Sequence, residues 1–151
     1  MTETSPSATA DGVETSPSLL YLLKRTELVV RARLEELLKP AGVTALQYTA
    51  LTVLERRDGV SAAQLARDSF VTAQSMADMV RALETRGLVR REPNPRNGRE
   101  KVILLAEAGR RLLARYAEPA RALEDRMVHD LAPADVERFR DYLKSAHRSL
   151  S

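Results

Sequence analysis

The sequence of 151 residues contains no cysteine and no tryptophan, and it has only two histidines, His129 and His147. Without cysteine the chain has no disulfide framework, thiolate zinc site, cysteine nucleophile or thiol redox switch. Both histidines lie in charged stretches that we interpret as helix surface. A phosphate-binding glycine loop, a G-x-S-x-G motif and an H-E-x-x-H motif are all missing. We therefore expect no enzyme, no cofactor and no metal site.

Long apolar runs are also missing, since no stretch approaches the ~20 residues that a membrane helix needs. The first residues have neither the basic start nor the apolar segment of a secretory signal. With 44% hydrophobic and 30% charged residues, the composition is typical of a helix-rich globular domain. We expect a cytoplasmic protein that makes no use of a membrane.

Positive charge is concentrated in one segment of the chain. The whole sequence has 24 Lys and Arg against 21 Asp and Glu, a net charge of +3. Residues 1–17 hold three acidic and no basic side chains, so the remainder carries +6. Between residues 81 and 101, seven basic side chains accompany three acidic ones. Such a cluster is typical of a protein that binds a polyanion, although a solvated basic surface has the same composition.

The chain divides into an N-terminal tail and one folded domain. Residues 1–17 are rich in Ser, Thr and Pro without a periodic apolar face, which predicts a disordered tail. A helix follows, with Ser18 as its N-cap and with Pro40 and Gly42 at its end. Its apolar residues recur at intervals of three and four, at Leu19, Leu23, Val30, Leu34, Leu37 and Ala41.

Capping signals predict three helices in the next segment. The predicted N-caps are Thr44, Ser61 and Thr72, and the first two are followed by Gln47 and Gln64 in the pattern of a capping box. We expect the first of these helices to stop near Asp58-Gly59. We expect the second helix to end at residues 68–71. The third should end at Gly87, because a helix commonly ends at a residue in the left-handed backbone conformation, usually glycine.

The pattern changes to a β-hairpin after this third helix. Residues 88–91 and 101–105 are strand candidates, and the segment 93–98 between them is a basic loop rich in Pro, Asn and Gly. Strand, basic loop and strand together predict a small two-stranded β wing.

Two further helices complete the chain. We expect one from Ala106 to about Leu131, bent or interrupted at Pro119, and a last one with Pro133 in its first turn. The last helix carries a narrow apolar stripe that suits helix–helix packing, at Val136, Phe139, Leu143, Ala146 and Leu150.

The segment from Ser61 to Leu105 has the order of a winged helix-turn-helix, whose second helix enters the major groove of DNA. At 100° per residue this helix has an inner apolar set of Met76, Met79, Val80 and Leu83 and a polar outer set. The candidate DNA contacts are Thr72, Gln74, Ser75, Asp78 and Arg81 on the helix and Arg96 and Arg99 in the wing loop. Their position between a capped helix and a basic wing favours contacts with base edges and phosphates.

The run from Val43 to Gly109 resembles the MarR (multiple antibiotic resistance regulator) family of winged helix-turn-helix repressors. The matching pieces are Leu46-Gln47-Tyr48, SAAQLA from Ser61, VRALETRGLV from Val80, NPRNGR from Asn94 and LAEAG from Leu105. No single piece is specific, but their order and spacing are. With the flanking helices, the resemblance covers roughly residues 18–149.

The resemblance implies a mainly α fold and a homodimer within one domain, residues 18–151. Residues 18–42 and 106–151 would be the dimerisation helices, and residues 43–105 the DNA-binding lobe. It also implies a repressor of a palindromic operator in double-stranded DNA, released by a small aromatic or phenolic ligand between lobe and dimer helices. Candidate ligand contacts are Lys24, Arg25, Arg31 and Tyr48, each of which also fits a solvated or salt-bridged role.

Two residues depart from the family's pattern. The family usually has Asp where this chain has Asn97, so a hydrogen bond to Arg99 is possible here but an ion pair is not. The family usually starts the next helix with a Thr cap, which is Ala106 here, a loss worth ~1 kcal/mol. Both changes predict a looser wing.

Two other classes of protein stay open from the residues alone. One is a winged-helix module that binds protein instead of DNA, and the other is a small helical enzyme. The basic wing and the polar helix face argue against the first, and the missing catalytic motifs argue against the second. Binding to DNA with a steep salt dependence separates the regulator from both.

Overall fold

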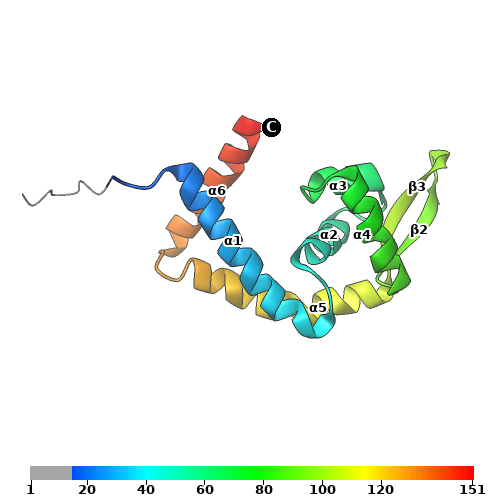
Figure 1. Ribbon diagram of the computed structural model, residues 1–151, viewed down its shortest axis with the longest axis horizontal. Helices are drawn as coiled ribbons and strands as arrows, with labels where there is room; N and C mark the ends of the chain where they lie inside the picture. The colour runs from blue at the N-terminus through cyan, green and yellow to red at the C-terminus, as the bar shows by residue number, and fades with distance from the viewer. Residues whose placement is uncertain (1–14) are drawn as a thin grey trace, which may run out of the picture.

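The structure is a computed structural model that describes residues 15–151, so residues 1–14 of the predicted tail lie outside the described part. The elements are α1 (Leu19–Leu38), the 3-10 helix η1 (Lys39–Ala41), α2 (Ala45–Arg56), β1 (Val60–Ser61), α3 (Ala62–Asp68), α4 (Ala73–Thr85), β2 (Val89–Asn94), β3 (Asn97–Leu105), α5 (Glu107–Met127) and α6 (Pro133–Leu150). Helices α2, α3 and α4 and the hairpin form one lobe, and α1, α6 and the far half of α5 extend from it (Figure 1). This arrangement confirms the predicted fold class.

Side-chain caps begin the first four α-helices where the sequence predicted them. The hydroxyls of Ser18, Thr44, Ser61 and Thr72 each accept the backbone N–H three residues on, at 3.1 Å. At Thr44 the capping box is complete, because the side-chain oxygen of Gln47 accepts the Thr44 N–H at 3.0 Å. These caps satisfy backbone donors that a helix start otherwise leaves unpaired.

The second predicted capping box is only half formed. Ser61 caps α3, but the Gln64 amide donates to Asp68 at 2.9 Å and accepts from Arg67 at 2.7 Å. Arg67 and Asp68 lie about one turn further along α3, and both are charged. The Gln64 amide therefore binds them in place of the backbone N–H of the N-cap residue Ser61.

The hairpin belongs to a three-stranded antiparallel sheet of order β1-β3-β2, whereas the sequence predicted two strands. The third strand, β1, pairs Val60 with Ile103, and the sequence signal missed it because it has only two residues. Both long strands also extend further into the predicted loop, and only Pro95 and Arg96 stay between them. Pro93 is tolerated because β2 is an edge strand, where a missing N–H removes no necessary ladder bond.

The core fills the lobe and reaches into the flanking helices. Its fully buried side chains include Leu54 of α2, Leu65 of α3, Met76 and Leu83 of α4 and Ile103 of β3. Leu38 of α1 and Leu113 and Tyr116 of α5 belong to the same cluster. The lobe and the beginning of the long helices are therefore held together by one apolar core.

Helix α5 is continuous through Pro119, where the sequence predicted a bend or an interruption. Proline removes one N–H donor, and its partner in the ladder would be the carbonyl of Arg115. Both residues are exposed, so water can reach this side of the helix. The helix ends at Met127, earlier than the predicted Leu131, and Pro133 occupies the first turn of α6 as expected.

Much of the apolar surface of α1 and α6 is uncovered within one chain. Leu19 and Leu20 are 79% and 77% exposed, and α6 has no buried residue, with Leu150 at 87%. A large apolar surface of this kind marks an interaction site. No helix within residues 15–151 combines the length and the apolar character that crossing a membrane requires.

Candidate nucleic-acid interface

Helix α4 has the inner and outer faces that its sequence predicted. Met76, Val80 and Leu83 are buried in the lobe core, with Met79 half-buried beside them. Of the five candidate contacts on this helix and its cap, all are exposed: Thr72, Gln74, Ser75, Asp78 and Arg81. The apolar face anchors the helix, and the polar face is left free to meet a ligand.

The beginning of α4 has one preorganised pair and one available amide. Thr72 accepts the N–H of Ser75 at 3.1 Å, and its hydroxyl donates to the Ser75 hydroxyl at 3.0 Å. Gln74 has no hydrogen-bond partner within the described part of the chain. A glutamine amide presents both a donor and an acceptor, which is the pattern that reads adenine in the major groove.

Further along the same face, Arg81 forms an ion pair with Asp78 one turn away. Both side chains are more than 60% exposed, so the pair is surrounded by water and contributes little to stability. The carboxylate orients the guanidinium along the helix. A phosphate or guanine that binds Arg81 competes with Asp78 for it.

At the tip of the wing, two asparagines brace the turn. Asn94 accepts the N–H of Arg96 at 3.0 Å, and Asn97 accepts the N–H of Arg99 at 3.2 Å. The expected bond between Asn97 and Arg99 is thus present and goes to the backbone. Neither arginine side chain has an ion-pair partner among residues 15–151, so both guanidinium groups are available to an anion.

The wing is fastened to α4 by a pair that sequence reasoning missed. Arg91 on β2 donates to Glu84 on α4 through two nitrogens, at 3.0 and 3.2 Å. The hydrogen bond from Arg91 holds the pKa of Glu84 below its usual value, and the same bond raises the pKa of Arg91. Two residues seven positions apart on different elements give no local sequence signal.

The base of the wing is held by Asp58, which the sequence indicated only as a helix stop. One carboxylate oxygen accepts the N–H of Leu105 at 2.7 Å, and the other accepts from Arg110 at 3.3 Å. Arg110 also donates to the carbonyl of Leu105 at 3.1 Å. Ala106 makes no side-chain cap, as expected, but these bonds fix the same junction.

Of the four candidate ligand contacts, Lys24, Arg25 and Arg31 lie on α1 and Tyr48 lies on α2. Lys24 and Arg31 both pair with Glu27 on their own helix, the former at 3.7 Å. Arg25 is exposed, and Tyr48 is half-buried on α2. Burial and the nearby carboxylate of Glu55 raise the pKa of Tyr48, so its phenol stays neutral at physiological pH.

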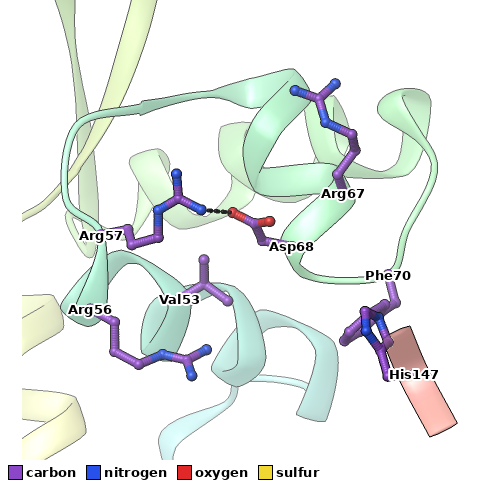
Figure 2. Close-up of a pocket in the computed structure, with 7 residues that line it drawn as sticks. All are labelled: Val53, Arg56, Arg57, Arg67, Asp68, Phe70 and His147. Carbon is purple, nitrogen blue, oxygen red and sulfur yellow. Dashed lines mark hydrogen bonds and ion pairs between the residues drawn. The ribbon is translucent and has the colours of Figure 1, made fainter. Parts of the chain in front are cut away.

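A cavity of about 330 Å³ lies instead between the lobe and the end of α6 (Figure 2). We call it the turn cavity, because it adjoins the turn between α3 and α4. Its lining residues are Val53, Arg56, Arg57, Arg67, Asp68, Phe70 and His147. None of the four ligand candidates belongs to it, and nothing in the sequence connected His147 with this turn.

Within residues 15–151, no three acidic or histidine side chains are placed together so that they could hold a metal ion. His129 lies beside Asp130 at 3.1 Å and is exposed. His147 is exposed as well and contacts the ring of Phe70.

A capped and exposed second helix beside a basic wing defines a winged helix-turn-helix protein. The sequence profile of the MarR family matches residues 41–100. The chain is also 32% identical over 133 residues to the HTH-type transcriptional repressor Rv2887 of Mycobacterium tuberculosis, covering 88% of this chain and 96% of the relative. The chain belongs to the MarR family of transcription regulators, as the resemblance of its sequence indicated.

Solved structures agree with this assignment. Rv2887 in complex with salicylic acid superposes with a TM-score of 0.69 at 32% identity, covering 88% of this chain and 98% of that one. CouR from Rhodococcus jostii bound to p-coumaroyl-CoA superposes with a TM-score of 0.78 at 28% identity, covering 85% of this chain and 91% of that one. The repressor CouR bound to a 23-mer DNA duplex superposes with a TM-score of 0.73 at 27% identity, covering 86% of this chain and 92% of that one.

Proposed function

We propose that the protein is a homodimeric, DNA-binding transcription repressor that a small aromatic acid releases from its operator. The observation that carries the proposal is the exposed polar face of α4 beside two unpaired arginines, Arg96 and Arg99, at the wing tip. Within residues 15–151 neither of these two has an ion-pair partner. The amide of Gln74 suits a base edge, and the wing guanidinium groups suit phosphates or a minor groove. A relative solved with a DNA duplex has the same fold.

The uncovered helices support a dimer. The exposed leucines of α1 and the unburied stripe of α6 lie at the same end of the molecule, away from the wing (Figure 1). A second copy that covers them would use residues 18–42 and 106–151 and leave residues 43–105 as the DNA-binding lobe. Two lobes related by a twofold axis read a palindromic operator with half-sites about 34–36 Å apart.

An aromatic acid as the effector is supported by the relatives. Rv2887 has been solved with salicylic acid and CouR with p-coumaroyl-CoA. The candidates from the sequence are Lys24, Arg25, Arg31 and Tyr48. A ligand that binds better to one lobe separation than to another shifts the dimer towards it and changes the affinity for DNA.

The proposal gives the chain no catalytic role and places it in the cytoplasm, where bacterial DNA lies. Two alternatives compete with it: a winged helix that binds another protein, and a small helical enzyme. The two wing arginines favour a polyanion over either alternative.

Binding to fluorescent duplex DNA at several salt concentrations tests the proposal. We expect an affinity that falls steeply with salt, with a log–log slope of about −0.9 for each phosphate that the protein neutralises. Sedimentation should show a dimer for the intact chain and a monomer when residues 133–151 are deleted, and the deletion should abolish DNA affinity as well. An intact chain without salt-dependent DNA binding would overturn the proposal.

A further inference from the structure

Another cavity, of about 480 Å³, lies where the end of α4 and the 3-10 helix η1 meet the first half of α5. We call it the arginine cavity, because its polar lining side chains are Arg86, Arg111, Arg115 and Tyr116, and its other lining residues are apolar. In Figure 1 the end of α1 and the first half of α5 meet below the lobe, away from the wing tip. Helix α4 has 13 residues and is about 20 Å long, so the cavity lies at the far end of this helix from its Thr72 cap.

The arginine cavity contains positive charge without a counter-ion. Its three charged side chains are Arg86, Arg111 and Arg115, and no carboxylate of the described residues lines it. None of the three forms an ion pair within residues 15–151. Like charges gathered in this way repel one another, so an anion that enters the cavity relieves the repulsion.

Two of the three guanidinium groups are held in place by other contacts. Arg86 donates to two carbonyl oxygens at the end of η1, and its remaining N–H groups are left for another acceptor. The guanidinium carbon of Arg115 lies 5.8 Å from the centre of the Tyr116 ring, in a cation–π contact. Arg111 makes no hydrogen bond within the described part of the chain. The cavity therefore offers an anion several donors, of which two groups are already positioned.

Tyr116 gives an independent observation that points to a ligand. Its side chain lines the cavity and is only 7% exposed, yet its hydroxyl makes no hydrogen bond with any of residues 15–151. A tyrosine hydroxyl that is buried to this extent normally has a partner. The acceptor that the Tyr116 hydroxyl lacks in the chain itself can come from a ligand in the cavity.

We propose that the arginine cavity binds the phosphoryl group of a small molecule, such as a phosphate monoester or a pyrophosphate. A carboxylate carries one negative charge on two oxygens, whereas a phosphoryl group at neutral pH carries a charge of about −1.5 to −2 and three acceptor oxygens. Three guanidinium groups and one hydroxyl match the second better than the first. This ligand is distinct from the aromatic acid of the proposed function, and its binding does not depend on that function.

Calorimetric titration of the intact protein with pyrophosphate, at constant ionic strength and without DNA, is the direct test. We expect one saturable site for each chain. Benzoate at the same concentration should not displace the pyrophosphate, because it has a single charge and two acceptor oxygens. Titration without saturable heat would overturn the site. Displacement of pyrophosphate by benzoate would overturn the assignment of a phosphoryl ligand.

Variants locate the bound anion. Arg111→Gln should weaken pyrophosphate binding about tenfold, because it removes a charge-assisted bond from an exposed residue without a partner in the described part of the chain. Tyr116→Phe retains the ring in the core and removes only the hydroxyl, and it should weaken binding as well. Arg121→Gln, on an exposed part of α5, should leave the affinity unchanged. Equal weakening by Arg111→Gln and Arg121→Gln would mean that general charge attracts the anion, which contradicts the proposal.

The phosphate of a DNA backbone has the same chemistry, so the variants are also titrated with duplex DNA. We expect Arg111→Gln to leave DNA affinity and its salt dependence unchanged. If this variant instead lowers DNA affinity and the log–log salt slope while pyrophosphate affinity stays the same, the cavity holds a backbone phosphate and the proposal is wrong. A protein that binds pyrophosphate in this cavity but binds no DNA would refute the proposed function alone.

Discussion

The guanidinium of Arg86 donates a 2.9 Å hydrogen bond to the carbonyl oxygen of Gly42, which joins the end of α4 to the end of η1. A second nitrogen of Arg86 donates to the carbonyl of Ala41 at 2.6 Å. Gly42 has a φ of 67° and ends the helix, so a cation here also complements the negative end of its dipole. The helix that we propose faces DNA is thus tied to the first helix, which we propose is part of the dimer interface.

We predict that Arg86→Ala lowers the free energy of unfolding by about 1 kcal/mol, since it removes these bonds from solvent-accessible carbonyls. Urea denaturation followed by circular dichroism measures the change. Arg121→Ala is the matched control, because Arg121 is exposed on α5 and has no partner among residues 15–151. Equal stability of the two variants would mean that the bonds from Arg86 contribute nothing.

Gly109 lies where α5 crosses the base of the hairpin, and the space there admits no side chain. A Cβ at this position would lie 2.3 Å from the carbonyl oxygen of Leu88 and 2.7 Å from a methyl carbon of Leu105. We predict that Gly109→Ala lowers the free energy of unfolding by about 2–3 kcal/mol, despite the better helix propensity of alanine.

Gly98→Ala is the control for this prediction, because a Cβ added at Gly98 meets nothing within 4 Å. Its stability should stay within about 0.5 kcal/mol of the unaltered protein. Thermal and urea denaturation of both variants measure the two changes in stability. A stable Gly109→Ala protein would show that the hairpin base can move away from α5.

The helix starts were predictable because a cap is a local feature. Ser18, Thr44, Ser61 and Thr72 each stand within three residues of the donor that they satisfy, so the sequence pattern contains the whole interaction. The inner face of α4 was predictable for the same reason, since its apolar spacing follows the helix period. The strand β1 was not, because two residues have no period and depend on a partner 43 positions away, Val60 with Ile103.

The interactions that place the candidate site likewise join residues that are far apart in the sequence. The carboxylate of Asp58 is fixed by Leu105 and Arg110, which are distant in the sequence. The turn cavity needs Phe70 and His147 to meet, although 76 residues separate them in the chain. Arg31 was predicted as a ligand contact from its residue type, and this stays a prediction; the structure adds that Glu27 pairs with it one turn away.

The pair between Glu84 and Arg91 should make stability depend on pH. The hydrogen bond from Arg91 holds the pKa of Glu84 below its ordinary value of 4.5. A carboxyl whose pKa is lowered by folding stabilises the folded state above its unfolded pKa, and this contribution disappears as the pH falls through the folded pKa. We predict that Glu84→Gln is less stable than the unaltered protein at pH 7 and that the difference shrinks below pH ~4.

Denaturation in urea at a series of pH values measures this difference. Glu118→Gln serves as the control, because Glu118 is exposed on α5 without an ion-pair partner in the described part of the chain. Its difference from the unaltered protein should be small at every pH. A gap for Glu84→Gln that is constant from pH 7 to pH 3 would contradict the assigned cause.

Base reading and phosphate anchoring should separate between α4 and the wing. Gln74 presents its amide on the outer face of α4, whereas Arg99 lies at the wing tip with its backbone fixed by Asn97. We predict that Gln74→Ala lowers the ratio of operator to random DNA affinity, by about 1–3 kcal/mol for each base that the amide reads. Arg99→Ala should weaken binding to both duplexes alike and reduce the log–log salt slope by roughly one for each phosphate that the guanidinium neutralises.

Titration of both variants on an operator duplex and a scrambled duplex, at two salt concentrations, distinguishes these roles. Arg81 is the informative third position, because Asp78 pairs with it and must release it before it binds DNA. If Arg81 reads a guanine, Arg81→Ala should behave like Gln74→Ala, and if it holds a phosphate, like Arg99→Ala. Should Arg99→Ala alter neither affinity nor slope, Arg99 does not touch DNA. The first cause to test is then the residue at position 97, where this chain has Asn97 in place of the Asp that the family usually has. The variant Asn97→Asp makes this test.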